Sequence, residues 1–114
     1  MGLAGKDPRL VPYGGNNFGL PTELQTSFIT PTETFFVRSN GPVPEVDPET
    51  WRLEVNGLVD SPLSLSLAEG RGFPAVTTTA FLECAGNSRT TFEPTAEGTP
   101  WRNDAVSNTT WTRT

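Results

Sequence analysis

The sequence predicts a small fold that consists mainly of strands and loops. Of its 114 residues, 11 are glycine and 11 are proline, which is well above the usual combined share of about 12%. Glycine carries a high entropic cost in a helix and proline lacks a backbone donor, so both disfavour long helices. Hydrophobic residues make up 34% of the chain, and the length allows one small domain with a thin core.

Short apolar and β-branched runs, separated by turn residues, locate the predicted strands. Residues 51–57 alternate apolar and polar side chains, which is the pattern of a strand with one buried face, and their final Asn-Gly marks a turn. Residues 76–82 form a strand that leads directly to Cys84, and residues 109–114 begin a further element. The predicted strands are residues 35–38, 51–57, 58–60, 63–67 and 76–82.

The remaining segments are predicted to hold little regular structure. Residues 1–30 are rich in Gly, Pro and Asn and are interpreted as an extended N-terminal arm, in which Thr22 caps a short helical turn over residues 22–27. Residues 68–73 offer room for a short helix, but two interior glycines each cost it up to about 1 kcal/mol, so we expect it to be weak or lost. Residues 85–108 are predicted to be mostly loop. The aromatic residues expected in the core are Phe35, Phe36, Trp51, Phe73, Phe81 and Phe92.

The charge and the composition exclude several classes of function. The net charge is −5 and histidine is absent, so the chain lacks the basic footprint of a nucleic-acid-binding protein. It has no run of about 18 apolar residues, so no membrane span is expected. Its N-terminus lacks the apolar centre of a secretory signal, so we expect either a cytoplasmic chain as written or a true start that lies upstream. A single cysteine allows no intramolecular disulfide.

The segment around Cys84 carries the most informative chemistry. Leu82-Glu83-Cys84-Ala85-Gly86-Asn87-Ser88-Arg89 places a thiol at the end of a strand, where the backbone is rigid and a glycine lets a bulky group approach. A cation at Arg89 favours thiolate over thiol, and thiolates are soft ligands that suit transition metals. The competing interpretation is a half-buried cysteine at a strand–loop junction, which is the commoner role of a lone cysteine.

Four separated motifs, in one order along the chain, resemble those of the sulfite oxidase family. Cys84-Ala85-Gly86-Asn87-Ser88-Arg89 is similar to the family's Cys-Ala-Gly-Asn-x-Arg motif. Residues 30–44 look like the family's first cofactor-contacting strand and loop, and residues 51–63 resemble the strand pair that follows. Residues 101–111, from Trp101 to Trp111, look like the segment after the cysteine loop.

The resemblance implies a mixed α+β fold that cradles one molybdenum–molybdopterin cofactor, without a heme. It implies that Cys84 is the single protein ligand of the metal, and that Arg38 is a catalytic residue that binds the oxyanion substrate. The cofactor-binding residues that it implies are Phe36, Val37, Arg38, Ser39, Asn40, Asn87 and Arg89. Without the family, Arg38 is interpreted as an exposed charge at a strand end, and Asn87 and Arg89 as ordinary loop residues.

The resemblance covers only the first part of the family's catalytic domain. Residues 31–114 correspond to the N-terminal half of the molybdopterin-binding oxidoreductase domain, so we expect a β-rich, partial domain that is truncated at its C-terminus. The family's homodimerisation domain is missing here. Many family members have Arg-x-His where this chain has Arg38-Ser39-Asn40, and an asparagine cannot ionise near pH 7.

The function that the resemblance implies is the oxidation of sulfite or a similar small oxyanion, with two electrons passed to an acceptor. The chain by itself is expected to be inactive. The alternatives are a reductase of the methionine-sulfoxide-reducing branch, a truncated remnant without activity, and a β-rich binding module. The ordered motifs argue against an unrelated module but not against a remnant.

Overall fold

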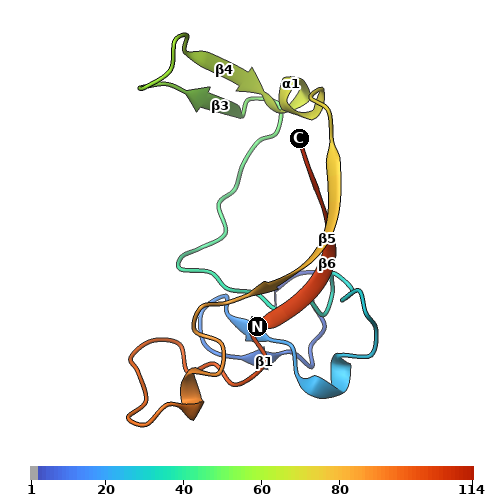
Figure 1. Ribbon diagram of the computed structural model, residues 1–114, viewed down its shortest axis with the longest axis vertical. Coiled ribbons are helices and arrows are strands. Elements are labelled where there is room, and N and C mark those ends of the chain that lie inside the picture. Colours follow the sequence, from blue (N-terminus) through green and yellow to red (C-terminus); the bar gives the residue numbers. More distant parts are fainter. Residues whose placement is uncertain (1–2) are drawn as a thin grey trace. The chain divides into compact units, whose positions relative to one another are not determined.

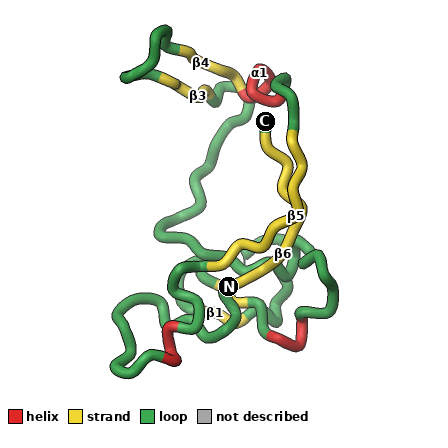
Figure 2. The backbone as a smooth tube through the Cα atoms, viewed as in Figure 1, coloured by secondary structure: helices red, strands yellow, loops and turns green. Residues whose placement is uncertain are grey.

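Strands and loops make up nearly all of the chain that the structure describes (Figures 1 and 2). The computed structural model describes residues 3–114. Within them the helical elements are one α-helix, α1 (Leu67–Arg71), and two 3-10 turns, η1 (Thr22–Leu24) and η2 (Arg89–Thr91). The strands are β1 (Val11–Pro12), β2 (Phe18–Gly19), β3 (Arg52–Val55), β4 (Leu63–Ser66), β5 (Val76–Glu83) and β6 (Val106–Arg113). The strand-rich character expected from the composition is confirmed.

Contacts divide the described chain into two units. Unit 1 comprises the chain up to Val43 together with Thr79–Thr110, and unit 2 comprises Pro44–Thr78 and Trp111–Thr114. In unit 1, β1 pairs antiparallel with β2, and in unit 2, β3 pairs antiparallel with β4. β5 pairs with β6 in a further two-stranded sheet, and both of these strands contribute residues to each unit.

The core of unit 1 is small and is built around Trp101. The indole is only 1% exposed and its ring meets Phe36 edge-on, with 6.5 Å between the ring centroids. Leu10, Leu20 and Leu24 pack into the same cluster, so the segment interpreted as an extended arm supplies half of the buried hydrophobic residues. Leucine burial of this kind typically contributes about 1.5–3 kcal/mol for each side chain.

The predicted set of core aromatics is wrong for most of its members. Phe36 is buried as expected, and Phe35 is half-buried against the core. The others are exposed, because each lies in a loop or in a two-stranded sheet that has no second layer packed on it in the described structure. Their exposed fractions are 37% for Trp51, 50% for Phe73, 68% for Phe81 and 62% for Phe92.

The predicted strand at residues 35–38 is reduced to a single bridge. Val37 exchanges backbone hydrogen bonds with Phe18, at N–O distances of 2.8 and 2.9 Å. The preceding residues cannot extend the pairing, because the backbone N–H groups of Thr34 and Phe35 donate to the carbonyl of Pro31 in a turn. The predicted cap of the first helical turn is also wrong, since η1 begins after Pro21 and lacks a side-chain cap.

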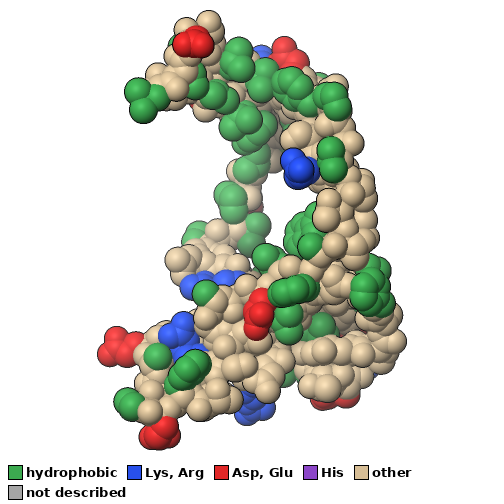
Figure 3. All heavy atoms as spheres, viewed as in Figure 1, with side chains coloured by type: hydrophobic (Ala, Val, Ile, Leu, Met, Phe, Trp, Pro, Cys, Tyr) green, Lys and Arg blue, Asp and Glu red, His purple; other side chains and the backbone are tan. Residues whose placement is uncertain are grey.

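Unit 2 contains a hairpin whose register matches the sequence pattern, although its apolar residues are not buried. Arg52 lies opposite Ser66 and Val55 opposite Leu63, and Gly57 makes the turn with a φ of +89°. Leu53, on the face predicted to be buried, is 46% exposed. Hydrophobic side chains accordingly gather on the surface of the hairpin in Figure 3.

The helix that was expected to be weak or lost is present as α1. Its N-terminus is stabilised by a capping box: the Ser66 hydroxyl accepts from the backbone N–H of Glu69 at 3.2 Å, and the Glu69 carboxylate accepts from the backbone N–H of Ser66 at 2.8 Å. A capping box satisfies two helix-end donors and is worth about as much as the one interior glycine, Gly70, costs, since Gly72 lies at the C-cap. The Ser-x-x-Glu pattern was therefore the signal to weigh against the glycines. No helix in residues 3–114 is long and apolar enough to cross a membrane.

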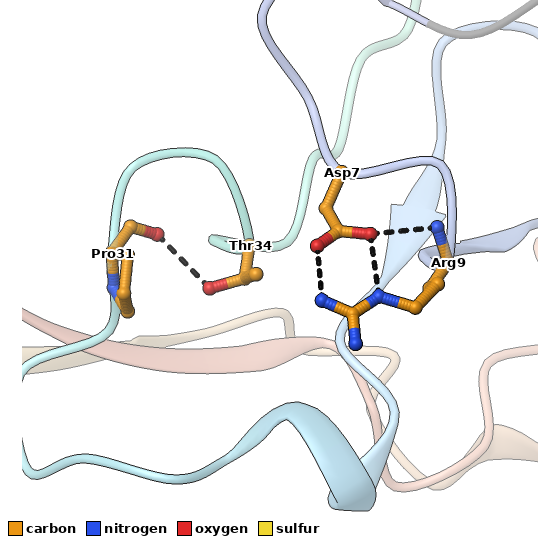
Figure 4. Close-up of polar contacts among 4 residues, drawn as sticks. All are labelled: Asp7, Arg9, Pro31 and Thr34. Atoms are coloured by element: carbon orange, nitrogen blue, oxygen red, sulfur yellow. Dashed lines mark hydrogen bonds and ion pairs between the residues drawn. The ribbon is translucent and has the colours of Figure 1, made fainter.

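Near the beginning of unit 1, Asp7 and Arg9 form a local ion pair (Figure 4). The carboxylate of Asp7 accepts hydrogen bonds from the guanidinium of Arg9, at 2.6 and 3.0 Å, and from the Arg9 backbone N–H at 2.9 Å. The hydrogen bond from the Arg9 side chain is the main reason why the pKa of Asp7 is lowered to about 2. The same view shows Thr34 donating its hydroxyl proton to the Pro31 carbonyl at 3.2 Å.

The depressed pKa of Asp7 predicts a pH-dependent contribution to stability. Because the folded value of about 2 lies below the unfolded value of about 3.9, the contribution is present above about pH 4 and is lost as the pH falls towards 2. Asp7→Asn is expected to lower the Tm slightly at neutral pH and to converge with the wild type near pH 2. Thermal unfolding at a series of pH values measures this. Asp60→Asn is the control, and a wild-type–variant gap that stayed constant with pH would contradict the prediction.

Candidate functional site

Cys84 lies directly after the last residue of β5, in unit 1. Its backbone N–H donates to the carbonyl of Ala105 at 2.9 Å, and Ala105 is fully buried. The cysteine is half-buried and packs against the core cluster. The structure therefore places the thiol at a rigid strand end, as the sequence predicted, with part of its surface open.

The Cys loop (residues 84–91) is laid against a second stretch of chain, which we call the backing segment (residues 101–105). The backbone N–H of Ser88 donates to the carbonyl of Arg102 at 2.8 Å, and that of Thr90 to the carbonyl of Trp101 at 3.1 Å. Ser88 has a left-handed backbone with a φ of +61°, a conformation that a non-glycine residue adopts only when its surroundings hold it. The loop is thus fixed along its length, and not only at Cys84.

Asn87 uses both ends of its amide within this structure. Its Nδ2 donates to the carboxylate of Glu83 at 2.9 Å, and its Oδ1 accepts from the backbone N–H of Ala105 at 3.0 Å. Its own backbone N–H donates to the carbonyl of Cys84 at 2.8 Å. These contacts support a role in ordering the Cys loop, whereas contact with a cofactor stays a prediction for this residue.

Arg89 folds back over its own loop. Its Nη1 donates to the carbonyl of Glu97, and its Nη2 would lie 2.6 Å from a Cβ at Gly86, so the guanidinium would have to shift if that glycine were replaced. The Nε of Arg89 is buried without a hydrogen-bond partner among the described residues. A buried donor without an acceptor is unusual in a native structure, and an acceptor supplied from outside the chain would remove its cost.

Residues 36–40 form the second group of predicted site residues. The backbone N–H of Phe36 donates to the Ser107 hydroxyl at 3.1 Å, which ties this stretch to β6. Val37 makes the bridge to β2. Beyond it the chain leaves the core, so that Arg38 and Asn40 are exposed and Ser39 is half-buried.

Amide oxygens, and not carboxylates, hold the Arg38 guanidinium. Its Nη2 donates to the Oδ1 of Asn40 at 2.6 Å and its Nη1 to the Oδ1 of Asn17 at 3.4 Å. No ion pair neutralises Arg38 among residues 3–114. Because amides are neutral, the guanidinium keeps its full charge and its remaining donors for an anion.

Asn17 contacts the predicted site residue Arg38, and sequence reasoning missed it. Its Oδ1 also accepts from the backbone N–H of Ser39 at 2.9 Å, so it orients Arg38 and the chain beside it. The surrounding Gly14-Gly15-Asn16-Asn17 run belongs to the stretch that the sequence predicts to be an extended arm. Two adjacent asparagines after two glycines gave no local signal of a partner that lies 21 residues away.

The predicted residues Asn87 and Arg89 line one hollow of unit 1, and Ser39 and Asn40 line another, whereas Cys84 and Arg38 line neither of these two hollows. The hollow beside the Cys loop has a volume of about 200 Å³ and the one beside residues 39–42 about 490 Å³. They share no lining residue, and no hydrogen bond or ion pair of the described chain joins Arg38 to Cys84. The described residues also contain no cluster of three or more His, Cys, Asp and Glu side chains placed to hold a metal.

The chain is similar to several known proteins. Residues 40–113 match the family described as "Oxidoreductase molybdopterin binding domain". The chain is 45% identical over 95 residues to sulfite oxidase from Gallus gallus, an alignment that covers 80% of this chain and 21% of that protein. It is 36% identical over 114 residues to nitrate reductase [NADH] from Volvox carteri, covering 94% of this chain and 13% of that protein.

The structure is also similar to that of a solved enzyme. It matches the sulfane dehydrogenase SoxCD from Paracoccus pantotrophus with a TM-score of 0.64 and 31% sequence identity, covering 76% of this chain and 23% of that one. The chain thus spans less than a quarter of the length of each of these proteins.

Proposed function

Because the chain belongs to the family of oxidoreductase molybdopterin-binding domains, we propose that it carries the metal-ligating and anion-binding part of a sulfite-oxidase-type enzyme. The substrate is sulfite or a similar small oxyanion. Sulfite and water become sulfate, with two protons released and two electrons passed to an acceptor. The observation that carries the proposal is the position of Cys84, at a strand end whose backbone is hydrogen-bonded to a buried residue.

The residues present fit a molybdenum–molybdopterin cofactor. Cys84 offers a soft, half-buried thiol as a metal ligand. The buried, unpartnered Nε of Arg89 supplies a donor for an acceptor atom of a ligand. When bound, the cofactor supplies the oxygen-atom transfer and the two-electron redox chemistry.

The chain's own residues have distinct tasks in this proposal. Cys84 holds the metal, and residues 36–40 contact the pterin. Arg38 binds the oxyanion with paired hydrogen bonds from its guanidinium, which Asn17 and Asn40 orient without neutralising it. Asn40 stands where many family members have histidine, so any task here that requires a protonated imidazole is absent from this chain.

Nitrate reduction is a second candidate, favoured by the similarity to the Volvox carteri enzyme over 94% of the chain. Nitrate is also a small oxyanion, and the uncompensated Arg38 suits either substrate. The spacing of the site residues does not separate the two substrates, so the experiment below measures both reactions.

A chimera tests the proposal. The 95 aligned residues of this chain replace their counterparts in the Gallus gallus enzyme, and the product is purified from cells that make the cofactor. We expect near-stoichiometric molybdenum by elemental analysis and sulfite-dependent reduction of an electron acceptor. The 114-residue chain alone is the comparison, and we expect it to retain neither. Its hollow beside the Cys loop, about 200 Å³, is smaller than the roughly 300–1,000 Å³ of typical ligand sites.

Each other outcome of the chimera experiment counts against a specific part of the proposal. A folded chimera without molybdenum would remove Cys84 and the Cys loop from the cofactor site. A molybdenum-loaded chimera that reduced nitrate but did not oxidise sulfite would replace the substrate by the second candidate. Sulfite turnover by the 114-residue chain alone would show that the described residues suffice.

A further inference from the structure

The backing segment is held on its far side by the N-terminal strands of unit 1. The hydroxyl of Tyr13, which follows β1 directly, accepts a hydrogen bond from the backbone N–H of Arg102 at 3.2 Å. The same hydroxyl donates to the Oδ2 of Asp104 at 2.6 Å. The Tyr13 ring also packs on Trp101, with 4.6 Å between the centroids. One side chain therefore contacts three of the five residues of the backing segment.

Asp104 depends on Tyr13 for the hydrogen bonding of its carboxylate. The residue is only 5% exposed, and its Oδ1 has no hydrogen-bond partner among the described residues. A Cβ at Gly19 would lie 2.4 Å from the carboxylate, so the chain closes tightly over it. Removing the Tyr13 hydroxyl would leave the carboxylate without a donor and the Arg102 N–H without an acceptor, and unsatisfied buried polar groups are costly.

The residue after Asp104 is the one to which Cys84 is bound. Ala105 is fully buried and commits both backbone groups to the Cys loop: its carbonyl accepts from the N–H of Cys84, and its N–H donates to Asn87. Any movement of the backbone at Asp104 changes the position of Ala105 and thereby of Cys84. The backbone carbonyl of Asp104 is anchored in turn by the N–H of Leu20, at 2.7 Å.

We propose that Tyr13 is a positioning residue for Cys84, acting through Asp104 and Ala105 of the backing segment. The inference rests on the proposed role of Cys84 as metal ligand, because it assigns to Tyr13 the task of holding that ligand at a fixed place. A hydroxyl suits this task because it donates and accepts at once. Burial, followed by the hydrogen bond to Asp104, raises the pKa of Tyr13, so the phenol keeps its proton for Asp104 well above neutral pH.

Amide hydrogen exchange in the 114-residue chain tests the link without a metal. In Tyr13→Phe, which keeps the ring on Trp101, we expect the amides of Cys84 and Ala105 to exchange faster by on the order of 10-fold, the effect of losing about one hydrogen bond. The amides of Phe18 and Val37, which bond to each other and not to the backing segment, are expected to keep their rates. Alkylation of Cys84 by iodoacetamide, measured over a range of pH, is expected to be faster in the variant at every pH.

Matched variants separate positioning from general destabilisation. Thr34→Val removes another hydroxyl of unit 1, one that donates to Pro31, and should leave Cys84 exchange unchanged. Asp104→Asn keeps an acceptor for the Tyr13 hydroxyl, so it should change the exchange rate of the Cys84 amide less than Tyr13→Phe does. Asp104→Ala tests the link from its other end if Tyr13→Phe does not fold. Unchanged exchange at Cys84, or equal acceleration at Cys84 and Phe18, would overturn the proposal.

The test is independent of the metal-ligand role. If Cys84→Ser retained sulfite oxidation in the chimera while Tyr13→Phe still loosened Cys84, the positioning link would stand and the ligand role would fall. If Cys84→Ser abolished activity while Tyr13→Phe left Cys84 exchange unchanged, the ligand role would stand and the positioning link would fall.

Discussion

Replacing Cys84 with serine in the chimera is expected to lower sulfite oxidation by more than about 100-fold. Loss of a residue that only orients a metal ligand typically costs 10–100-fold, and loss of the single protein ligand should cost more. A hydroxyl is a harder and less acidic donor than a thiol, so it replaces a thiolate poorly. The fold should survive, because the hydrogen bond from Cys84 to Ala105 uses the backbone. Steady-state turnover and circular dichroism measure the two effects.

Ala75→Ser is the control for this substitution. It adds the same hydroxyl at an exposed position outside the Cys loop and should leave turnover close to that of the unmodified chimera. Turnover within a few-fold of that value in Cys84→Ser would exclude Cys84 as the metal ligand.

The second large effect is expected at Arg38. Arg38→Gln in the chimera removes a charge-assisted contact with the substrate, which is typically worth about 1.5–3 kcal/mol. The KM for sulfite should therefore rise by on the order of 10- to 100-fold, since 1.4 kcal/mol corresponds to a factor of ten. Initial rates over a range of sulfite concentrations separate this effect on KM from an effect on kcat.

Two further variants frame the result at Arg38. Arg38→Lys keeps the charge but loses the planar pair of donors, so its KM should lie between those of the parent chimera and Arg38→Gln. Arg71→Gln removes an exposed positive charge in unit 2 and should leave KM unchanged. Equal rises in the KM for sulfite in Arg71→Gln and Arg38→Gln would mean that Arg38 acts only through the overall charge of the chain.

The central strands were predictable because their sequence pattern is local. The alternation over residues 51–57 gave β3, the run at 63–67 gave β4, and residues 76–82 gave β5. Neighbouring side chains of a strand point to opposite faces, so a few consecutive residues suffice to recognise one. The strand predicted at residues 35–38 is only a single bridge, because its pairing depends on Phe18, a partner distant in sequence.

The members of the core and the presence of the helix could not be predicted from hydrophobic patterns and residue propensities alone. Leu10, Leu20 and Leu24 come from a stretch rich in glycine and proline, yet they pack on Trp101. Phe73, Phe81 and Phe92 are residue types typical of a core, but no layer covers them in the described structure. In α1, the glycines alone predicted a weak or absent helix, and the capping box at Ser66 offsets their cost.

The candidate site was predictable where a motif is contiguous and not where it is assembled from distant chain segments. The position of Cys84 at a strand end followed from its own neighbourhood. The contacts of Asn17 with Arg38, and of Tyr13 with Asp104, span 21 and 91 residues. Only the fold brings such pairs together, so composition and spacing could not assign these roles.

The most direct test of Cys84 as the metal ligand is the sulfur coordination of molybdenum in the chimera. X-ray absorption at the molybdenum edge counts the sulfur atoms bound to the metal, and the comparison is between the parent chimera and the chimera with Cys84→Ser. We expect the substitution to remove one sulfur from the first coordination sphere of whatever metal remains bound, because the Cys84 thiolate is a soft ligand. An identical sulfur count in the two proteins, with the metal retained, would contradict it.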